Sequence, residues 1–290
     1  MHSFYKILIR ISIIFIWLPL SQANTLPENH AINGGLTIIP IDIKQKPEVY
    51  YDNHRVAVIK SPNPDQWLMI VGVPLSNIQS IQQLHMTKPM QANIPFHVSD
   101  KYYKTQYLTI DNQRKVDPYA EDKQRIEDEN KKLTAIFSQY SQSNPFAHGF
   151  IPPAYGPISS QFGLKRVYNK QPRAPHSGLD IAAPENAPVT AISPGKVVEA
   201  GDYFFTGNTV IIDHGMGIFS LYAHLKKIDV KQGEQIKQGQ LIGTVGMTGR
   251  VTGPHLHWSM IMNQTYVNPL LFVPERTIAT VPKQSKAKEG

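Results

Sequence analysis

Two stretches, His176-Ser177-Gly178-Leu179-Asp180 and Gly253-Pro254-His255-Leu256-His257-Trp258, enclose the segment that decides the fold and chemistry of this chain. Another histidine, His224, lies between them in Tyr222-Ala223-His224-Leu225. Five of the eleven histidines of the 290-residue chain fall in this segment. Neutral imidazole and carboxylate groups are ligands of catalytic zinc, which takes three protein ligands and keeps one position open. The segment therefore predicts a metal site.

The spacing of these residues favours a site built on strands. His255 and His257 are two positions apart in a predicted strand, so both side chains leave the same face. One of them could bind a metal while the other stands beside it. Asp180 follows His176 by four residues in a segment without helical periodicity, so a loop must turn both groups inward. A helical zinc motif of the His-Glu-x-x-His type is therefore not what this sequence contains.

The motifs, taken together and in this order, resemble those of the LytM/lysostaphin-type zinc metallopeptidases. Flanking segments agree with the resemblance, which covers about residues 155–272; they are Gln161-Phe162-Gly163, Ser177 to Pro184, Gly207 to Gly215 and Gly246-Met247-Thr248-Gly249. The upstream region, with Val116-Asp117-Pro118, is similar to the N-terminal region of periplasmic members from Gram-negative bacteria.

The resemblance implies a peptidase that uses one Zn²⁺ to cut peptide cross-links of peptidoglycan. It implies that His176, Asp180 and His257 are the metal ligands, and that His255 and His224 are the catalytic histidines. A histidine has an unperturbed pKa of about 6.5, so it can accept and return a proton near neutral pH. We favour His255 as the base because it lies beside His257, and His224 as oxyanion stabiliser or proton donor.

The predicted architecture is mainly β. For residues 151–275 the resemblance implies an all-β open barrel or sandwich of the lysostaphin-like type, a duplicated hybrid motif. Short apolar runs separated by glycine and proline agree with this expectation. They predict strands at 158–162, 179–182, 196–200, 209–213, 218–224, 241–245 and 255–260.

Residues 24–115 predict a separate, small antiparallel β domain. Its strands are expected at 37–43, at 56–59 and 67–73 as a hairpin, and at 94–98 and 107–110. Residues 116–150 predict a long helix and a linker. Asp117 would be the helix N-cap with Pro118 at the first helical position. Tyr119, Ile126, Leu133 and Tyr140 repeat every seven residues, which predicts about six turns packed against one or both domains.

The N-terminal segment indicates export. Lys6, Arg10, the apolar run 11–20 and Ser21-Gln22-Ala23 predict a signal peptide at 1–23, with a retained membrane anchor as the alternative. Residues 276–290 predict a basic, disordered tail. The chain has no cysteine, which excludes disulfides and thiolate catalysis. Its formal charge of +7 suits anionic wall polymers, and no basic stripe indicates nucleic acid. We expect a monomer in the periplasm, with no transmembrane span in the mature chain.

Several alternatives remain at the level of the sequence. The chain could be a non-catalytic wall-binding regulator of other hydrolases, or a carboxypeptidase on the same peptides. Residues 230–245 also have the rhythm of a biotinyl or lipoyl carrier domain, but no lysine stands at the tip that a carrier needs. His214 is interpreted as structural, and Arg250 either as a solvated loop residue or as a partner for a substrate carboxylate. The bond that is cut, predicted as D-alanyl–diaminopimelate, is not determined by these residues.

Overall fold

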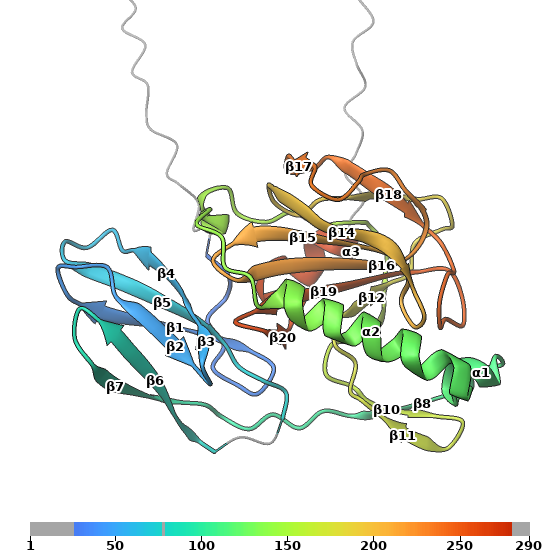
Figure 1. Ribbon diagram of the computed structural model, residues 1–290, viewed down its shortest axis with the longest axis horizontal. Coiled ribbons are helices and arrows are strands. Elements are labelled where there is room, and N and C mark those ends of the chain that lie inside the picture. The colour runs from blue at the N-terminus through green and yellow to red at the C-terminus, as the bar shows by residue number, and fades with distance from the viewer. Residues whose placement is uncertain (1–25, 77–78, 280–290) are drawn as a thin grey trace, which may run out of the picture.

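The computed structural model describes residues 26–76 and 79–279, which form a mainly β protein with one long helix (Figure 1). The predicted fold class is confirmed. The predicted signal peptide at 1–23 and residues 280–290 of the predicted tail lie outside the described residues. No helix within the described ranges is both long enough and apolar enough to cross a membrane.

The C-terminal half is one ten-stranded sheet network that does not close into a barrel. Its central order is β17-β14-β15-β16-β19-β12-β9, with β13, β18 and β20 paired at the sides. The strands are β9 (Ile158–Ser160), β12 (Leu179–Ile181), β13 (Pro188–Thr190), β14 (Gly195–Tyr203), β15 (Gly207–Gly215), β16 (Ile218–Ile228), β17 (Gln235–Ile236), β18 (Leu241–Val245), β19 (Leu256–Met262) and β20 (Thr265–Val267). Each strand predicted from the sequence in this half is present.

The middle strands of this sheet are buried on both faces. Along β16, Phe219 and Leu221 pack under the long helix, whereas Tyr222 points into the main core with Trp258 of β19. This alternation follows from the period of two along a strand. Because both faces are covered, the strand reads as a continuous apolar run. Any polar group placed here is held rigidly and shielded from water.

The N-terminal double sheet, strands β1 to β7, is built differently. One sheet has the order β1-β5-β4 and the other β3-β2-β6-β7, all antiparallel. An apolar core that includes Val49, Val71 and Leu84 is shared by the two sheets. The predicted hairpin is confirmed as β4 and β5. The bounds are β1 (Leu36–Asp42), β2 (Glu48–Tyr51), β3 (His54–Arg55), β4 (Ala57–Lys60), β5 (Gln66–Gly72), β6 (Ile81–Lys88) and β7 (Ala92–His97).

The prediction that a strand at 107–110 completes this N-terminal sandwich is wrong. The strand that forms, β8 (Thr105–Leu108), pairs in parallel with β10 (Lys165–Tyr168), whose hairpin partner is β11 (Gln171–Arg173). Tyr103, just upstream, packs edge-on against Phe162 with 6.4 Å between ring centroids. This contact draws the chain away from the first two sheets and onto the C-terminal half.

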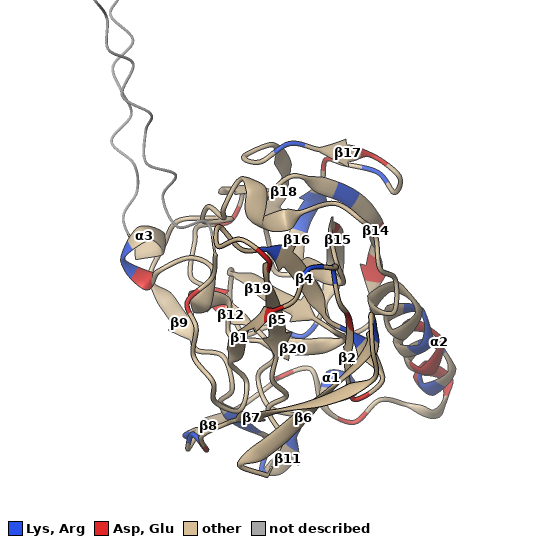
Figure 2. Ribbon diagram, turned by 90° about the vertical axis from the view of Figure 1, so that its left-hand side faces the viewer, with Lys and Arg blue, Asp and Glu red and all other residues tan. Residues whose placement is uncertain are grey.

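The long helix α2 (Ala120–Phe137) starts later than predicted. Asp117 is not its N-cap but ends the short helix α1 (Gln113–Val116), and its carboxylate accepts hydrogen bonds from Gln171 and Arg173. Tyr119 is the N-cap of α2. The apolar stripe packs as predicted at its C-terminal end, where Ile136 and Phe137 cover the sheet. Charged side chains of both signs lie along α2 (Figure 2).

The two halves are joined by direct packing and by one amide. Asn263, in the turn between β19 and β20, accepts a hydrogen bond from Gly72 N at 2.7 Å and donates one to Gly72 O at 3.0 Å. Leu36 and Ile70 of the N-terminal double sheet belong to the same core cluster as Trp258. Strand β5, which ends at Gly72, is therefore fixed against the C-terminal sheet.

The predicted disorder of the tail is wrong for its first residues. Residues 275–279 form α3 (Glu275–Ala279), in which Ile278 is fully buried and its carbonyl accepts a hydrogen bond from Gly156 N. Burial of the apolar Ile278 fixes this segment, although the basic composition of the tail predicted disorder. Two short 3₁₀ turns complete the described chain, η1 (Pro145–Ala147) and η2 (Pro269–Leu271).

Candidate metal centre

The structure brings one donor atom each from His176, Asp180 and His257 to a common point. Asp180 on β12 and His257 on β19 are direct partners across an antiparallel pair, and His176 lies in the loop before β12. His176 Nε2 is 2.9 Å from Asp180 Oδ1 and 3.0 Å from His257 Nδ1. Asp180 Oδ1 is 2.8 Å from His257 Nδ1. The three atoms form a nearly equilateral triangle, and we call these residues the metal centre.

The metal centre fits a zinc ion in both chemistry and size. Two imidazoles and one carboxylate are a ligand set of catalytic zinc sites. Ligands about 2.0 Å from a tetrahedral zinc are roughly 3.3 Å apart, slightly wider than the observed triangle. All three side chains are buried, so they are shielded from water apart from the side that faces the pocket. Small outward movements of these groups would accommodate the ion.

The partners of the two ligand histidines fix which nitrogen is available to a metal. His176 Nδ1 donates to the carbonyl of Gln161 at 2.8 Å, which leaves Nε2 with its lone pair. His257 Nε2 lies 2.9 Å from Ser259 Oγ and donates to it, which leaves Nδ1 with its lone pair. Outer hydrogen bonds of this kind set the tautomer and ring orientation of metal ligands. The two rings therefore use opposite nitrogens, and both free lone pairs face Asp180.

Arg166 holds the second oxygen of Asp180. Its Nη2 donates to Asp180 Oδ2 at 2.9 Å, while Oδ1 faces the histidines. Burial by itself raises the pKa of Asp180, but the close approach of the His176 and His257 rings outweighs burial, so its pKa lies well below the usual range. Asp180 is thus a carboxylate at neutral pH. Arg166 lies on β10, the strand that pairs with β8.

His224 and His255 stand beside the metal centre. The centroids of their rings are 4.9 Å apart, and the His224 ring is 5.9 Å from that of His257. His224 Nδ1 donates to the carbonyl of Thr248 at 2.8 Å, and His255 Nδ1 donates to that of Gly253 at 2.8 Å. In both rings the unprotonated atom is therefore Nε2. His255 Nε2 is 3.9 Å from Asp180 Oδ1, so it lies next to the metal centre.

Backbone geometry is unusual at His224, because its φ of +63° lies in the left-handed region. The pairing of β16 with β18 shifts register between Leu225 and Lys227, just after this residue. His224 N donates to Thr206 O at 2.9 Å, which ties the distorted position to the loop before β15. Left-handed residues other than glycine are costly and concentrate at functional sites. The distortion aims the imidazole at the other histidines.

Burial keeps the central histidines neutral. It lowers the pKa of His257 to about 4, against the opposing effect of the Asp180 carboxylate. It also lowers the pKa of His224 well below its ordinary value, and the neighbouring His255 and His257 lower it further. A neutral imidazole offers a lone pair, which is what a metal ligand or a proton acceptor requires. His257 and His224 are therefore in the right protonation state for such a role at neutral pH.

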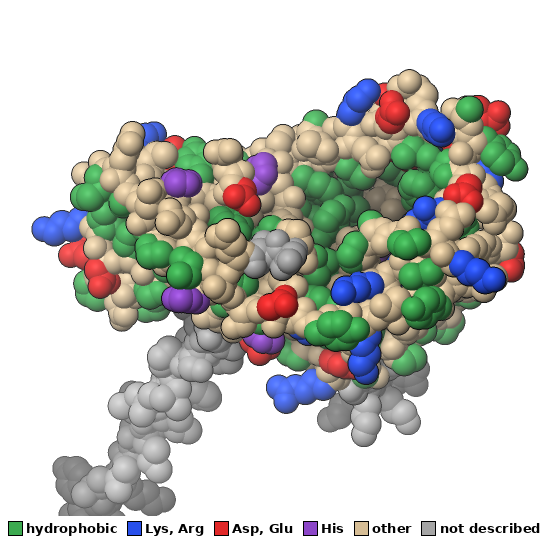
Figure 3. All heavy atoms as spheres, turned by 90° about the horizontal axis from the view of Figure 1, so that it is seen from below, with side chains coloured by type: hydrophobic (Ala, Val, Ile, Leu, Met, Phe, Trp, Pro, Cys, Tyr) green, Lys and Arg blue, Asp and Glu red, His purple; other side chains and the backbone are tan. Residues whose placement is uncertain are grey.

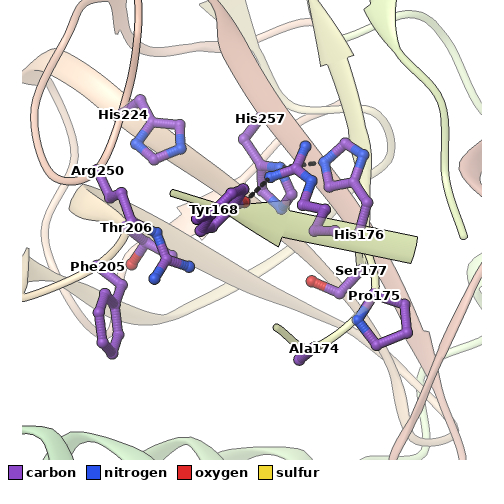
Figure 4. Close-up of a pocket in the computed structure, with 11 residues that line it drawn as sticks. Tyr168, Ala174, Pro175, His176, Ser177, Phe205, Thr206, His224, Arg250 and His257 are labelled. Atoms are coloured by element: carbon purple, nitrogen blue, oxygen red, sulfur yellow. Dashed lines mark hydrogen bonds between the residues drawn. The ribbon is translucent and has the colours of Figure 1, made fainter. Parts of the chain in front are cut away.

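A pocket of about 160 Å³ opens onto these residues (Figure 4). His176, His224 and His257 line it, with Ser177 and Pro175 on one side and Phe205, Thr206 and Arg250 on the other. Tyr168 of β10 projects across it in the same view. The pocket gives a ligand access to the face of the metal centre that is not covered by strands.

Sequence reasoning missed the outer partners of the metal centre, although some carried a signal. Ser259 is two residues after His257 on a strand, so it had to share the face of His257. Gln161 and Thr248 lie within flanking segments that carried the family resemblance, but they contribute backbone carbonyls, which any residue type could supply. Arg166 had no such signal, because its role depends on the pairing of β10.

His214 takes no part in this cluster, as predicted. Its Nδ1 donates to Pro194 O at 2.8 Å, and its Nε2 lies 2.7 Å from Ser220 Oγ. Ser220 Oγ is in turn 2.9 Å from the hydroxyl oxygen of Tyr222, which accepts from Ile192 N. Burial lowers the pKa of His214 to about 4. The residue is therefore a neutral member of a buried hydrogen-bonded chain.

Comparisons with known proteins agree with this site. The family model for Peptidase family M23 matches residues 174–269, and that for the Peptidase family M23 N-terminal domain matches residues 29–101. A solved structure described as peptidase M23 from Pseudomonas aeruginosa is 35% identical, with a TM-score of 0.72. The match covers 85% of this chain and 96% of that one. The chain therefore belongs to peptidase family M23, which also rules out the carrier-domain alternative.

Two curated relatives are similar over the C-terminal half. The peptidoglycan DD-endopeptidase ShyA of Vibrio cholerae is 41% identical over 133 residues, which are 45% of this chain and 30% of ShyA. The DD-carboxypeptidase/endopeptidase Mpg of Neisseria meningitidis is 41% identical over 131 residues, 44% of this chain and 30% of Mpg. This chain thus spans less than a third of the length of either relative in the match.

Proposed function

We propose that this chain is an exported zinc metalloendopeptidase that hydrolyses peptide cross-links of peptidoglycan, with the D-alanyl–diaminopimelate bond as its target. The observation that carries the proposal is the triangle of donor atoms at the metal centre with His224 and His255 beside it, next to a pocket that His176, His224 and His257 line. The activities for which ShyA and Mpg are named support the substrate class. The fit of His176, Asp180 and His257 to zinc supports the cofactor.

His255 and His224 have separate roles in this proposal. When bound, zinc acidifies water and polarises the scissile carbonyl. His255 accepts the proton of the attacking water through Nε2, the atom that faces Asp180 Oδ1 at 3.9 Å. The proton accepted by His255 passes to Nε2 of the adjacent His224, whose N–H then stabilises the oxyanion or delivers that proton to the leaving amine. The carbonyls of Gly253 and Thr248 keep both rings in the required orientation.

We further propose that the protein acts in the periplasm. The support is the predicted signal peptide and the Gram-negative origin of ShyA and Mpg. A periplasmic enzyme meets the peptide cross-links of the wall directly. Fractionation of cells that express the full chain would test the location, because an inner-membrane or secreted location would appear in a different fraction.

Incubation of the purified chain with Gram-negative sacculi tests the activity. We expect release of soluble muropeptides, loss of release with a chelator, and recovery when Zn²⁺ is added back. His176→Ala removes one ligand of the metal centre and should abolish release. The matched control is His97→Ala, which removes an exposed histidine of the N-terminal double sheet and should have no effect. Full release by His176→Ala would refute the zinc assignment.

A carboxypeptidase activity is the second candidate, favoured by the similarity to Mpg, which is named as a DD-carboxypeptidase/endopeptidase. Mass spectrometry of the released products separates the two. Endopeptidase action converts cross-linked dimers to monomers, whereas carboxypeptidase action shortens pentapeptides by one D-alanine. A non-catalytic regulator has less support, because the metal centre lacks none of its expected ligands. Such a regulator would release neither kind of product.

A further inference from the structure

Arg250 occupies a fixed position on the wall of the catalytic pocket. Its guanidinium lies over the ring of Phe205, 4.4 Å from the centroid, and over that of Tyr168, 4.7 Å from the centroid. Arg250 N donates to Phe205 O at 2.8 Å, which anchors its backbone to the same loop. In Figure 4 the side chain reaches into the pocket below His224. Arg250 is therefore not a solvated loop residue.

The charge of Arg250 has no acidic partner among residues 26–76 and 79–279. Its Nη1 donates to the carbonyl of Lys115 at 3.2 Å. The two neighbouring arginines are each ion-paired, Arg166 with Asp180 and Arg173 with Asp117. Burial lowers the pKa of Arg250, and the charges of Arg166 and Arg173 lower it further. A partly buried cation without an anion is costly, and a bound anion would remove that cost.

The loop that orients Arg250 is itself held from two sides. Lys115 Nζ donates to Phe204 O at 2.6 Å, and Phe204 N donates to the carboxylate of Glu129 on α2 at 2.9 Å. Phe205 follows directly, and its ring stacks edge-on against that of Phe204 with 4.9 Å between centroids. The protein's own contacts therefore hold the Phe205 ring, over which the Arg250 guanidinium lies. A preorganised guanidinium loses less entropy when it forms paired hydrogen bonds.

We propose that Arg250 binds the α-carboxylate of the leaving residue, the carboxylate on the carbon that carries the scissile nitrogen. This inference rests on the proposed function. The pocket places Arg250 with His224 and His257, so its anion lies next to the bond that is cut. A guanidinium fork matches a carboxylate with two parallel hydrogen bonds. Diaminopimelate cross-linked through one amine and a C-terminal D-alanine both present this group, so Arg250 is a specificity-determining residue for either.

Two cross-linked peptide dimers test the proposal, one with the carboxylate of the leaving residue free and one with it as a primary amide. For the unchanged protein we expect kcat/KM to fall about 10- to 100-fold on amidation, the size of a lost charge-assisted hydrogen-bond pair. Arg250→Gln should lower kcat/KM by a similar factor on the free acid and show no further fall on the amide. An equal loss on both dimers would overturn the proposal.

Two further variants separate this role from a general effect on folding. Arg250→Lys keeps the charge without the fork, so its acid-to-amide preference should be intermediate. Arg55→Gln removes an arginine that also lies over a tyrosine, 4.3 Å from the Tyr140 centroid, and that pairs with Glu48 outside the pocket. It should keep the full preference for the free acid. Loss of the preference in Arg55→Gln would show that the effect is not specific to the pocket.

Binding to the metal-free chain gives a readout that is independent of catalysis. Calorimetry with a diaminopimelate tripeptide, free acid or amide, should show tighter binding of the acid by the unchanged protein and no preference by Arg250→Gln. D-Alanyl-D-alanine tested in the same way separates the two sources of the carboxylate. If no dimer is cleaved, the proposed function fails, yet the binding comparison still decides the role of Arg250. Equal binding of acid and amide by the unchanged protein would refute it.

Discussion

The N-terminal double sheet and the C-terminal sheet are both antiparallel β structures, but they place polar groups differently. In strands β1 to β7 the shared core is apolar, and the histidines of this half reach the surface (Figure 3). In the C-terminal sheet the strands β12, β16 and β19 bury His257, Asp180, His224 and Ser259. Burying polar groups costs free energy unless each finds a partner. The C-terminal sheet therefore has to supply a partner for each buried polar group at the metal centre, as Arg166, Thr248 and Ser259 do.

The largest effect should come from the residue nearest to the proposed reaction. His255→Ala removes the proposed base and should lower kcat by roughly 10²- to 10⁴-fold, the range for general acid–base groups. Zinc content, measured by atomic absorption, should stay near one ion per chain because His255 is not a ligand. Loss of zinc together with activity would instead make His255 part of the metal centre.

A core substitution in the other half should change stability and leave chemistry intact. Leu84 on β6 is fully buried in the shared core of the N-terminal double sheet. Leu84→Ala should lower the free energy of unfolding by about 2–5 kcal/mol. Urea titration measures this loss, and kcat at a permissive temperature should be unchanged. A matching loss in kcat would mean that the two halves are coupled more tightly than their separate cores indicate.

His214 tests whether buried polar groups outside the metal centre also carry a pH-dependent cost. The pKa of His214 is about 4 in the folded chain, against 6.5 for an exposed histidine of the unfolded chain. Between these pH values the unfolded chain binds a proton at His214 that the folded chain does not. The stability linked to His214 is fully present above pH 6.5 and is lost as pH falls towards 4, by about 3 kcal/mol. Urea titrations of the metal-free chain at pH 7 and pH 4.5 should show this loss. His214→Gln should be less stable at pH 7 but lose less on acidification.

The smallest effect is expected from a partner of a ligand. Ser259→Ala removes the acceptor of the His257 Nε2–H and should weaken zinc binding by about 10- to 100-fold, as for other outer partners of metal ligands. Competition with a calibrated chelator measures this affinity. The apolar environment of β19 should tolerate alanine, so thermal stability of the metal-free chain should fall little. An unchanged zinc affinity would show that Ser259 does not orient the ring.

The metal centre was predictable from sequence because its three residues lie in two short motifs that carry a family resemblance. The resemblance implied His176, Asp180 and His257 as ligands, and β12 and β19, which carry Asp180 and His257, were visible as apolar runs. Residues whose role depends on distant pairing were not predictable. β8 joins β10 across about sixty residues of sequence, and no periodicity states which edge a short strand will meet. Arg166 and the orientation of Arg250 follow from that pairing.

The predicted boundaries of the long helix and of the tail were wrong for a related reason. Asp117-Pro118 satisfies the local rules for a helix start, but Gln171 and Arg173 from β11 engage the Asp117 carboxylate. The side chain that should cap the helix was therefore already occupied. In the tail, burial of one apolar residue, Ile278, orders a segment whose basic composition predicts disorder. In both places tertiary contacts overrode a sound local preference.

The left-handed backbone at His224 has a consequence for how this chain can be changed. Glycine would adopt a φ of +63° at lower cost, roughly 1 kcal/mol below that of a histidine. A library of variants sorted by heat resistance alone would therefore enrich replacements at position 224. The same library sorted by wall degradation would deplete them. If His224 has its proposed role, selection for thermal stability and selection for activity act in opposite directions at this residue. A thermostable variant obtained without an activity screen should then lose His224 first.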